Sequence, residues 1–370
     1  MAAKALAHDF LFQSDAFTIV AKLSIIVPAY NEAENIGRLV KSIFSSMEGL
    51  DFELIVVDDN SPDGTGKLAD EMASERKNMR VIHRQGKLGL GTAILDGLNV
   101  AGGEIIGVMD ADMQHPPEVL RTMMERAEGG ADIVIASRYV EGGNVEGWSL
   151  IRRTISKGAL WLSHLFLPRT RKVKDTLSGY FIFKRDVIKG VSIDLKDFKM
   201  LVEILAKGKY ETVAEVPYTF MTRTAGKSKL GYMQILSYVK QLLRLSEYRV
   251  LKFMAVGASG IIVNNGILLL LVSSMNMLPL LAEVFSIEAS IISNFVLNNF
   301  WTFKDRKIGS PLYRFLKYHG SVILGAIINY AVFALLTAAG LHIILANTVG
   351  ILTGFVSNYL LSETFVWKWP

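Results

Sequence analysis

Four long apolar segments in the last third of the chain constrain its fold more than any other feature. Each has about the ~20 residues that a helix needs to cross a lipid bilayer. Hydrophobic residues make up 51% of the chain, and a large buried helical core is the alternative, but helices of soluble proteins normally keep a polar face. We therefore predict four transmembrane helices, over residues 255–275, 278–300, 322–341 and 343–361.

The basic residues around these segments predict how the chain is oriented in the membrane. Two of the connections, 276–279 and 338–342, contain no Lys or Arg. Because Lys and Arg concentrate on the cytoplasmic side of membrane proteins, we expect the part before Val250 and both termini to be cytoplasmic. The basic flanks are Arg244, Arg249 and Lys252, then Lys304, Arg306, Lys307, Arg314 and Lys317, and finally Lys368.

The apolar part also repeats itself. One constant offset maps Ser293-Asn294 onto Ser357-Asn358, Asn265 onto Asn329 and Lys304 onto Lys368. Two hairpins of the same orientation are typical of a parallel repeat about an axis along the membrane normal. We therefore predict an integral membrane domain over 250–370 that consists of two related hairpins.

Apolar strand-like runs alternate with helical patterns in the first part of the chain. Runs that are apolar throughout belong to a sheet that is buried on both faces, so we predict an α/β fold with a mostly parallel sheet. Residues 1–21 fit neither this pattern nor a signal peptide, and we interpret them as an extension outside the fold. The predicted strands are 23–28, 52–59, 80–83, 104–110 and 131–137, and the first helices are 34–47, 66–75 and 91–101.

Polar clusters follow three of these strands, at the edge where parallel α/β sheets bind ligands. They are Tyr30-Asn31-Glu32, Asp58-Asp59-Asn60 and Asp110 to Gln114. A single acidic strand end is explained by capping of the next helix, but three at one edge favour a binding site. Asp and Gln oxygens suit a hard divalent cation, which typically brings substrate phosphates. The chain has no cysteine, which excludes disulfides and thiolate chemistry.

An ordered series of motifs carries a resemblance to a known family. The series begins with SIIVPAYNE, VVDDNSPDGT, RQGKLGLGTA and DADMQHP. It continues with RRTISKGALWLSHL, DTLSGYFIFKRDVI and EVPYTFMTRTAGKSKLG. Together they resemble family 2 glycosyltransferases of GT-A fold, and within that family the dolichol-phosphate mannose synthases. The resemblance covers roughly Lys22 to Tyr248 and implies a catalytic domain over 22–228. Residues 250–370 resemble the small four-helix GtrA-like membrane domains.

The resemblance implies transfer of mannose from GDP-mannose to a polyprenyl phosphate such as dolichyl phosphate, with inversion at the anomeric carbon. Asp112 and Gln114 would hold Mg²⁺ or Mn²⁺, which stabilises charge on the leaving GDP. Asp110 would lie nearer the ribose or the donor sugar, and Asp58 and Asp59 would accept hydrogen bonds from guanine. The other residues implied in donor binding are Pro28, Tyr30, Glu32, Lys87, Ala111 and Met113.

The acceptor phosphate needs cations that bind it, and it does not need a general base that activates it. A phosphate monoester has a second pKa of about 6, so it is already an anionic nucleophile near neutral pH. Glu203 is therefore interpreted as structural or orienting, and His115 as a turn residue. We assign Arg138, Arg152 and Ser156 to the acceptor phosphate, since guanidinium groups bind phosphate oxygens in pairs. Arg223 and Lys229 are assigned to donor or acceptor phosphates; attraction to the membrane surface is the alternative for these basic residues.

Two segments mix apolar and basic residues at helical spacing, and both could lie in the headgroup plane. They are 150–167 and an amphipathic interface helix over 229–249. Between the two, residues 166–179 could form a mobile loop that orders over the acceptor. Within the apolar part, Glu283 and Glu288 are either structural or functional, since carboxylates in a membrane are costly.

Two other functions remain open at this point. A UDP-glucose-dependent polyprenyl-phosphate glucosyltransferase would use the same chemistry, and a lipid-linked sugar flippase with a fused transferase would use the membrane domain. The partners we expect are a nucleotide sugar, a polyprenyl phosphate lipid and the bilayer. Nothing in the sequence indicates a nucleic acid or a required protein partner.

Overall fold

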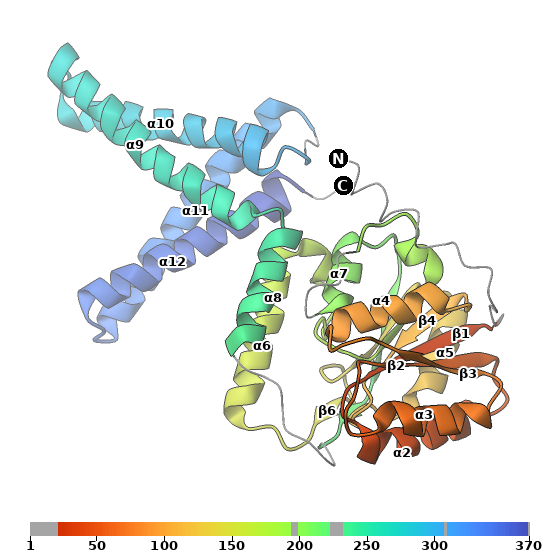
Figure 1. The fold of residues 1–370 in the computed structure, drawn as a ribbon. Coiled ribbons are helices and arrows are strands. Elements are labelled where there is room, and N and C mark those ends of the chain that lie inside the picture. The colour runs from red at the N-terminus through yellow and green to blue at the C-terminus, as the bar shows by residue number, and fades with distance from the viewer. Residues whose placement is uncertain (1–20, 194–198, 223–231, 307–308, 369–370) are drawn as a thin grey trace. The chain divides into compact units, whose positions relative to one another are not determined.

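The computed structural model describes residues 21–193, 199–222, 232–306 and 309–368. The chain divides into two compact units, of which the first ends at Leu245 and the second begins at Ser246. The α/β part forms the first unit, and the long apolar helices form the second (Figure 1).

A seven-stranded sheet in the order β3-β2-β1-β4-β7-β5-β8 forms the centre of the first unit. Only β7 runs antiparallel to its two neighbours, as expected for a mostly parallel sheet. β1 and β2 pair from Leu23 opposite Phe52 to Ala29 opposite Asp58, so their carboxyl ends are level. The strands are β1 (Leu23–Ala29), β2 (Phe52–Asp58), β3 (Met79–His83), β4 (Ile105–Val108), β5 (Ile133–Ser137), β7 (Phe181–Lys184) and β8 (Val213–Pro217).

Helices cover both faces of this sheet, as the continuous apolar strands predict. On β1, Leu23, Ile25 and Val27 face one core and Ile26 faces the other, because successive side chains of a strand point to opposite faces. The first core is closed by α2 (Ala33–Ser46), α3 (Thr65–Ser74) and α5 (Val119–Glu128). The second is closed by α4 (Leu90–Val100) and α7 (Met200–Lys207).

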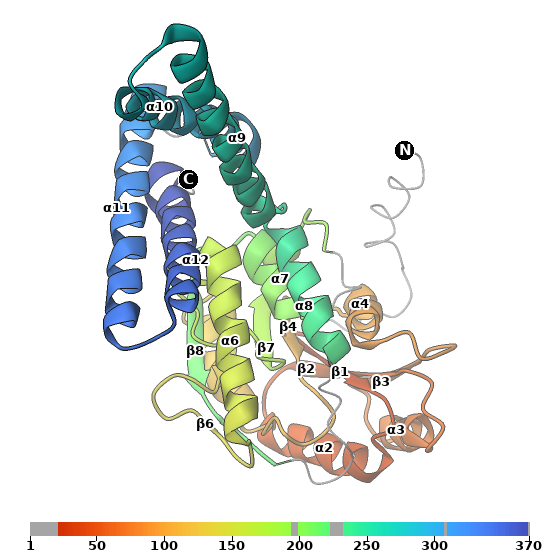
Figure 2. The same cartoon turned by 90° about the vertical axis from the view of Figure 1, so that its left-hand side faces the viewer.

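Two further helices lie side by side at the end of the first unit, α6 (Leu150–Phe166) and α8 (Tyr232–Leu245) (Figure 2). The Tyr238 hydroxyl on α8 donates to the Ala159 carbonyl on α6, at 3.0 Å. Leu150, Ile151 and Trp161 of α6 remain exposed, an arrangement compatible with the predicted interfacial role. A short pair of strands, β6 (Asn144–Val145) and β9 (Thr219–Phe220), precedes α6 and α8 in the sequence.

The structure differs from the expectation of a mobile loop over 166–179. This segment contains a short helical turn, η2 (Pro168–Thr170), and it packs into the first unit. Val173, Asp175 and Thr176 are buried, and the hydroxyls of Thr176 and Ser163 lie 2.8 Å apart. These buried side chains hold the middle of the segment inside the first unit.

The interface helix and the first membrane helix are separate elements. α8 ends at Leu245 and α9 begins at Arg249. Glu247 and Tyr248 between them both have positive φ, at 53° and 59°. Two successive left-handed residues interrupt a right-handed helix, so the predicted element 229–249 stops at Leu245.

The second unit consists of two helical hairpins, α9 (Arg249–Met275) with α10 (Pro279–Leu297) and α11 (Pro311–Ala338) with α12 (Ile343–Leu361). Their apolar spans have mean hydropathies between 1.5 and 2.0, and only 11% to 22% of each span is buried, as expected for helices whose solvent is lipid. Together these four helices are long and apolar enough to cross a membrane.

The two hairpins repeat each other in structure as well as in sequence. α10 and α12 each continue into a π-helical turn, η4 (Asn298–Thr302) and η5 (Ser362–Val366), at the offset that maps Asn294 onto Asn358. Gly260 packs against Asn294, and Gly325 packs against Asn358. This pairing makes Asn264, rather than Asn265, the counterpart of Asn329, because the first hairpin is one residue longer between these contacts. Asn264 donates to the Ser286 hydroxyl, at 3.1 Å.

Candidate functional site

The three polar clusters at the strand ends meet around one cavity of about 280 Å³. Each of their turns contains a non-glycine residue with positive φ: Asn31 at 58°, Asn60 at 60° and Met113 at 63°. Asn tolerates this region, but Met rarely adopts it, so the contacts around the last turn must hold it. The cavity is lined by Pro28, Ala29, Tyr30, Glu32, Asp59, Lys87, Gly89, Leu90, Ala93, Asp110, Ala111 and Asp112.

Most residues predicted for donor binding therefore line this cavity, but Asp58, Met113 and Gln114 do not. Asp58 instead faces its own turn, where its carboxylate accepts from the Ser61 N–H at 3.3 Å. Sequence reasoning missed the wall formed by Ala29, Gly89, Leu90 and Ala93. The glycine-rich GKLGLGTA was the available signal for part of that wall, but a lone glycine cluster is weak evidence for a site.

Asp59 shapes one side of the cavity by organising the glycine-rich loop. Its Oδ1 accepts from Arg84 at 2.5 Å and from the Leu88 N–H at 2.9 Å. Its Oδ2 accepts from the Gly89 N–H, also at 2.9 Å. A carboxylate oxygen has two lone pairs, so Oδ2 retains capacity for one donor from a ligand.

Tyr30 and Lys87 close another side of the cavity. The Lys87 ammonium lies 3.9 Å from the centre of the Tyr30 ring, a cation–π contact. Glu32 beside them accepts from the Asn35 amide at 2.8 Å. This wall combines an aromatic face with one charge of each sign, which suits a planar base attached to an anionic group.

The turn after β4 holds Asp110 and Asp112 through buried neighbours. The Asp110 N–H donates to Nδ1 of His115 at 3.0 Å, and the ring of His115 stacks on Tyr180 at 5.1 Å. Burial lowers the pKa of His115, so the ring is a neutral acceptor that fixes the turn. Asp112 accepts from the Gln114 N–H at 3.1 Å.

Gln114 is tied to a second part of the chain. Its side chain is buried, and its Nε2 donates to the Met221 carbonyl at 2.8 Å. This hydrogen bond engages the nitrogen of the side-chain amide, and the amide oxygen remains available as a ligand. Among the described residues, no group of three His, Cys, Asp or Glu could hold a metal ion on its own.

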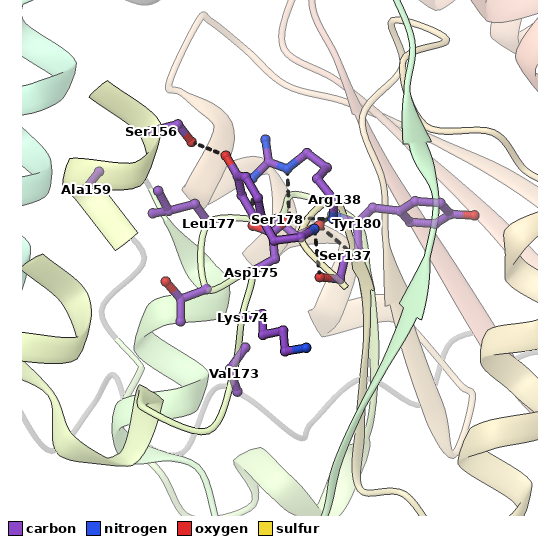
Figure 3. Close-up of polar contacts among 12 residues, drawn as sticks. Ser137, Arg138, Ser156, Ala159, Val173, Lys174, Asp175, Leu177, Ser178 and Tyr180 are labelled. Atoms are coloured by element: carbon purple, nitrogen blue, oxygen red, sulfur yellow. Dashed lines mark hydrogen bonds and ion pairs between the residues drawn. The ribbon is translucent and has the colours of Figure 1, made fainter. Parts of the chain in front are cut away.

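Arg138, which we assigned to the acceptor phosphate, is paired with a carboxylate of the chain itself. Its Nε and Nη2 each donate to Asp175 at 2.7 Å, and its backbone N–H donates to the same carboxylate at 3.0 Å (Figure 3). Both side chains are buried. The carboxylate keeps the pKa of Arg138 above its usual value despite burial, which acts in the opposite direction. Arg138 is thus permanently charged and locally neutralised.

Arg152 and Ser156 share aromatic neighbours with Arg138, whose guanidinium carbon lies 5.5 Å from the Tyr139 ring centre. The guanidinium carbon of Arg152 is 4.3 Å from the Trp148 ring centre, and that of Arg138 is 5.4 Å from it. The Ser156 hydroxyl lies 2.9 Å from the Tyr139 hydroxyl (Figure 3). The structure therefore brings three predicted acceptor residues together, while Arg223 and Lys229 lie outside the described residues.

The chain matches known proteins along nearly its whole length. Residues 24–191 match the model of glycosyl transferase family 2, and residues 252–367 match that of the GtrA/DPMS transmembrane domain. A dolichol-phosphate mannosyltransferase of Pyrococcus furiosus is 42% identical over 351 residues, which cover 94% of this chain and 99% of that protein. The chain belongs to glycosyl transferase family 2.

Two further relatives match the first part of this glycosyltransferase. A dolichol-phosphate mannosyltransferase of Saccharomyces cerevisiae is 36% identical, covering 61% of this chain and 87% of the relative. A polyprenol monophosphomannose synthase of Mycolicibacterium smegmatis is also 36% identical, covering 56% of this chain and 80% of the relative.

The site of this glycosyltransferase includes charged residues that the sequence did not reveal. Lys199 donates to the Leu177 carbonyl at 3.1 Å, and burial together with Arg138 lowers its pKa, against the effect of Asp110 and Asp175. Lys199 therefore contacts the segment that also carries Asp175. Asp175 occurs in the quoted motif DTLSGYFIFKRDVI, but nothing in its spacing identified it as the partner of Arg138.

Glu203 of this glycosyltransferase is engaged in salt bridges, as its interpretation as a structural residue requires. The carboxylate is fully buried and binds Lys207 at 2.6 Å and Arg244 at 2.8 Å. Gln241 also points its amide towards it, at 3.5 Å. Glu203 thus joins α7 to α8, and it does not line the cavity.

Proposed function

We propose that this glycosyltransferase moves mannose from GDP-mannose to a polyprenyl phosphate, dolichyl phosphate in particular, with inversion at the anomeric carbon. The observation that carries the proposal is the 42% identity to a dolichol-phosphate mannosyltransferase over 94% of the chain. In this proposal the cavity would bind the donor diphosphate through a divalent ion, and the arginine cluster of Arg138 and Arg152 would bind the acceptor phosphate.

GDP-mannose would enter the cavity with its nucleoside end. The Oδ2 atom of Asp59 has room for one guanine N–H, and the Tyr30 ring offers a stacking face. Lys87, 3.9 Å from that ring, is placed to follow the diphosphate. Asp110, which also lines the cavity, would contact the ribose or the sugar.

The donor set fits a hard divalent ion. Asp112 lines the cavity, and Gln114 next to it keeps an amide oxygen available. Mg²⁺ usually takes one or two protein carboxylates and completes its shell with water and substrate phosphates. Asp112 and Gln114 would hold Mg²⁺ or Mn²⁺, and the bound ion would neutralise charge on the leaving diphosphate.

The acceptor phosphate is a nucleophile without help from a base, because a monoester carries about −1.5 to −2 charges at pH 7. One of its oxygens forms a bond to the anomeric carbon as the bond from that carbon to the diphosphate breaks, which gives a phosphodiester and GDP. Arg138 and Arg152 would offset the repulsion between the two anions as they approach.

A transfer assay with purified full-length protein tests this proposal. GDP-mannose and UDP-glucose compete for a short prenyl phosphate in the presence of Mg²⁺ or Mn²⁺, and the linkage is read by NMR. We expect β-linked mannosyl lipid as the main product. A product labelled mainly from UDP-glucose would replace the mannosyl donor with a glucosyl donor, and no hexosyl lipid under any condition would overturn the proposal.

Asp112→Ala should abolish transfer, because the variant loses the carboxylate that would hold the ion at the diphosphate. The comparison variant is Asp186→Ala, whose side chain is 87% exposed on the surface of the first unit and should leave the rate unchanged. Initial rates at saturating donor measure the difference. Full activity of Asp112→Ala would remove this residue from the ion site.

A further inference from the structure

Trp148 lies at the centre of the arginine cluster, immediately before α6. Its ring contacts the guanidinium groups of both Arg138 and Arg152. Phe220 supports the ring from the side, with centres 5.5 Å apart and planes at 72°. One indole therefore lies against two cations that come from different elements.

The indole N–H of Trp148 has an unusual environment. Nε1 is buried, and no acceptor lies within hydrogen-bonding distance of it among the described residues. Buried Trp N–H groups normally find a partner, and leaving such a donor unsatisfied costs free energy. An anion bound between the two guanidinium groups would supply the missing acceptor.

The charges around Trp148 show what its neutral N–H would add to an anion site. Asp175 occupies two donors of Arg138 and cancels its charge locally, so Arg138 alone attracts a phosphate dianion weakly. Arg152 adds a second cation, and the N-terminus of the 17-residue helix α6 adds a partial positive charge. A neutral N–H adds a hydrogen bond without adding further net charge.

We propose that Trp148 binds the acceptor phosphate through its indole N–H and holds Arg138 and Arg152 around it. This inference rests on the proposed function and names one more residue of the acceptor site. The ligand chemistry is a phosphate monoester, which a prenyl phosphate and inorganic phosphate share. Because the contribution of the N–H differs from that of the ring, two substitutions separate them.

Steady-state kinetics of the full-length protein in detergent provide the first test. Trp148→Phe keeps an aromatic ring for the guanidinium groups and removes the N–H, so KM for a short prenyl phosphate should rise about tenfold, the loss expected for a hydrogen bond to a charged group. Trp148→Leu removes both and should raise it further. KM for GDP-mannose should stay unchanged in both variants. Trp301→Phe, the same substitution in the second unit, is the matched control.

The indole ¹⁵N–¹H resonance of Trp148 gives a readout that a merely structural role would not move. The Trp148→Phe variant identifies the cross-peak by its disappearance. A short prenyl phosphate should shift this peak strongly, inorganic phosphate should shift it at higher concentration, and the matching prenol should not shift it. A shift with GDP alone that equals the shift with prenyl phosphate would assign the N–H to the donor and overturn the inference.

The two proposals fail in different ways. Normal mannose transfer together with an immobile Trp148 peak overturns the role of Trp148 and leaves the proposed function intact. A peak that moves with prenyl phosphate in a protein that transfers no hexose supports the anion site and overturns the proposed function. An unchanged acceptor KM in Trp148→Phe overturns the role of the N–H even if Trp148→Leu is impaired.

Discussion

Asp175 decides what Arg138 contributes to the site. A buried charged arginine without a partner is destabilising, and the bidentate pair at 2.7 Å both balances its charge and fixes its orientation. Asp175 is itself positioned because its N–H donates to Glu215 of β8 at 3.0 Å. The orientation of one cation in the proposed acceptor site therefore depends on a chain of two carboxylates.

Substitutions in the Arg138–Asp175 pair should separate stability from activity. Asp175→Leu alone leaves a buried charge uncompensated and should destabilise the first unit by about 3–5 kcal/mol. Combining it with Arg138→Met should recover most of that loss, because an apolar pair of similar size often replaces a buried ion pair at little cost. Transfer activity should stay low in both. Thermal unfolding and acceptor KM measure the two effects, and an active double variant would contradict the assignment of Arg138.

Asp132 should make the stability of the first unit depend on acid pH. Burial raises the pKa of its carboxyl, but N–H groups of Glu211 and Thr212 and contacts with Lys184 outweigh burial and bring it to about 2, from 3.8. A lowered folded-state pKa stabilises the fold above the unfolded value. This contribution is complete above about pH 4 and is lost as pH falls towards 2.

Asp132→Asn should therefore reduce the change in the thermal unfolding midpoint between pH 4 and pH 2. Asp186→Asn, an exposed residue, serves as the control. Midpoints followed by circular dichroism across this range provide the measurement. An equal slope in wild type and Asp132→Asn would show that the carboxylate does not act in this way.

At the residue scale, sequence reasoning identified candidate site residues by their chemical type and their position at strand ends. It missed the residues that contact them from distant parts of the sequence. Asp110, Asp112 and Asp59 were predicted because carboxylates recur at strand ends, and all three line the cavity. Asp175 and Trp148 were not, since their roles depend on contacts between segments distant in sequence. The strain at Met113 was equally invisible, because left-handed conformation is predictable for Asn or Gly but not for Met.

At the scale of elements, apolar runs located the strands to within two residues, but α9 and α11 begin at Arg249 and Pro311, well before the predicted starts at residues 255 and 322. β1 and β2 begin at the predicted residues, Leu23 and Phe52. β7, which runs against its neighbours, was not predicted, because direction depends on the connection and not on composition. The end of α8 at Leu245 was also missed, since the two left-handed residues that follow it are Glu247 and Tyr248.

The hairpin α11–α12 depends on glycines that let the helices approach. A Cβ at Gly354 would meet the Asn329 side chain at 2.9 Å and the Gly325 carbonyl at 3.0 Å, whereas a Cβ at Gly320 would meet nothing within 4 Å. Gly354→Ala should destabilise the second unit by about 1–3 kcal/mol, and Gly320→Ala should not. Thermal unfolding in detergent compares the two variants, and equal midpoints would contradict close packing at Gly354.

At the scale of the whole molecule, the described residues of the proposed site lie in the first unit and the membrane-spanning helices in the second. Because the chain has no cysteine, single cysteines can report its orientation. With a cytoplasmic catalytic unit, Ala339→Cys in a connection without basic residues should react with an impermeant maleimide in intact cells. Lys304→Cys should react only in inverted vesicles. Reversed labelling would place the catalytic unit outside.

The two π-helical turns of the second unit end at residues that are counterparts in the repeat. Phe303 and Trp367, which follow η4 and η5, stack on each other with centres 4.6 Å apart and planes at 9°. Each ring thus has its own duplicate as its neighbour, so a substitution in one half alters the surroundings of the equivalent position in the other. The two halves are therefore coupled directly at this stack, where a ring contact joins the turns that follow α10 and α12.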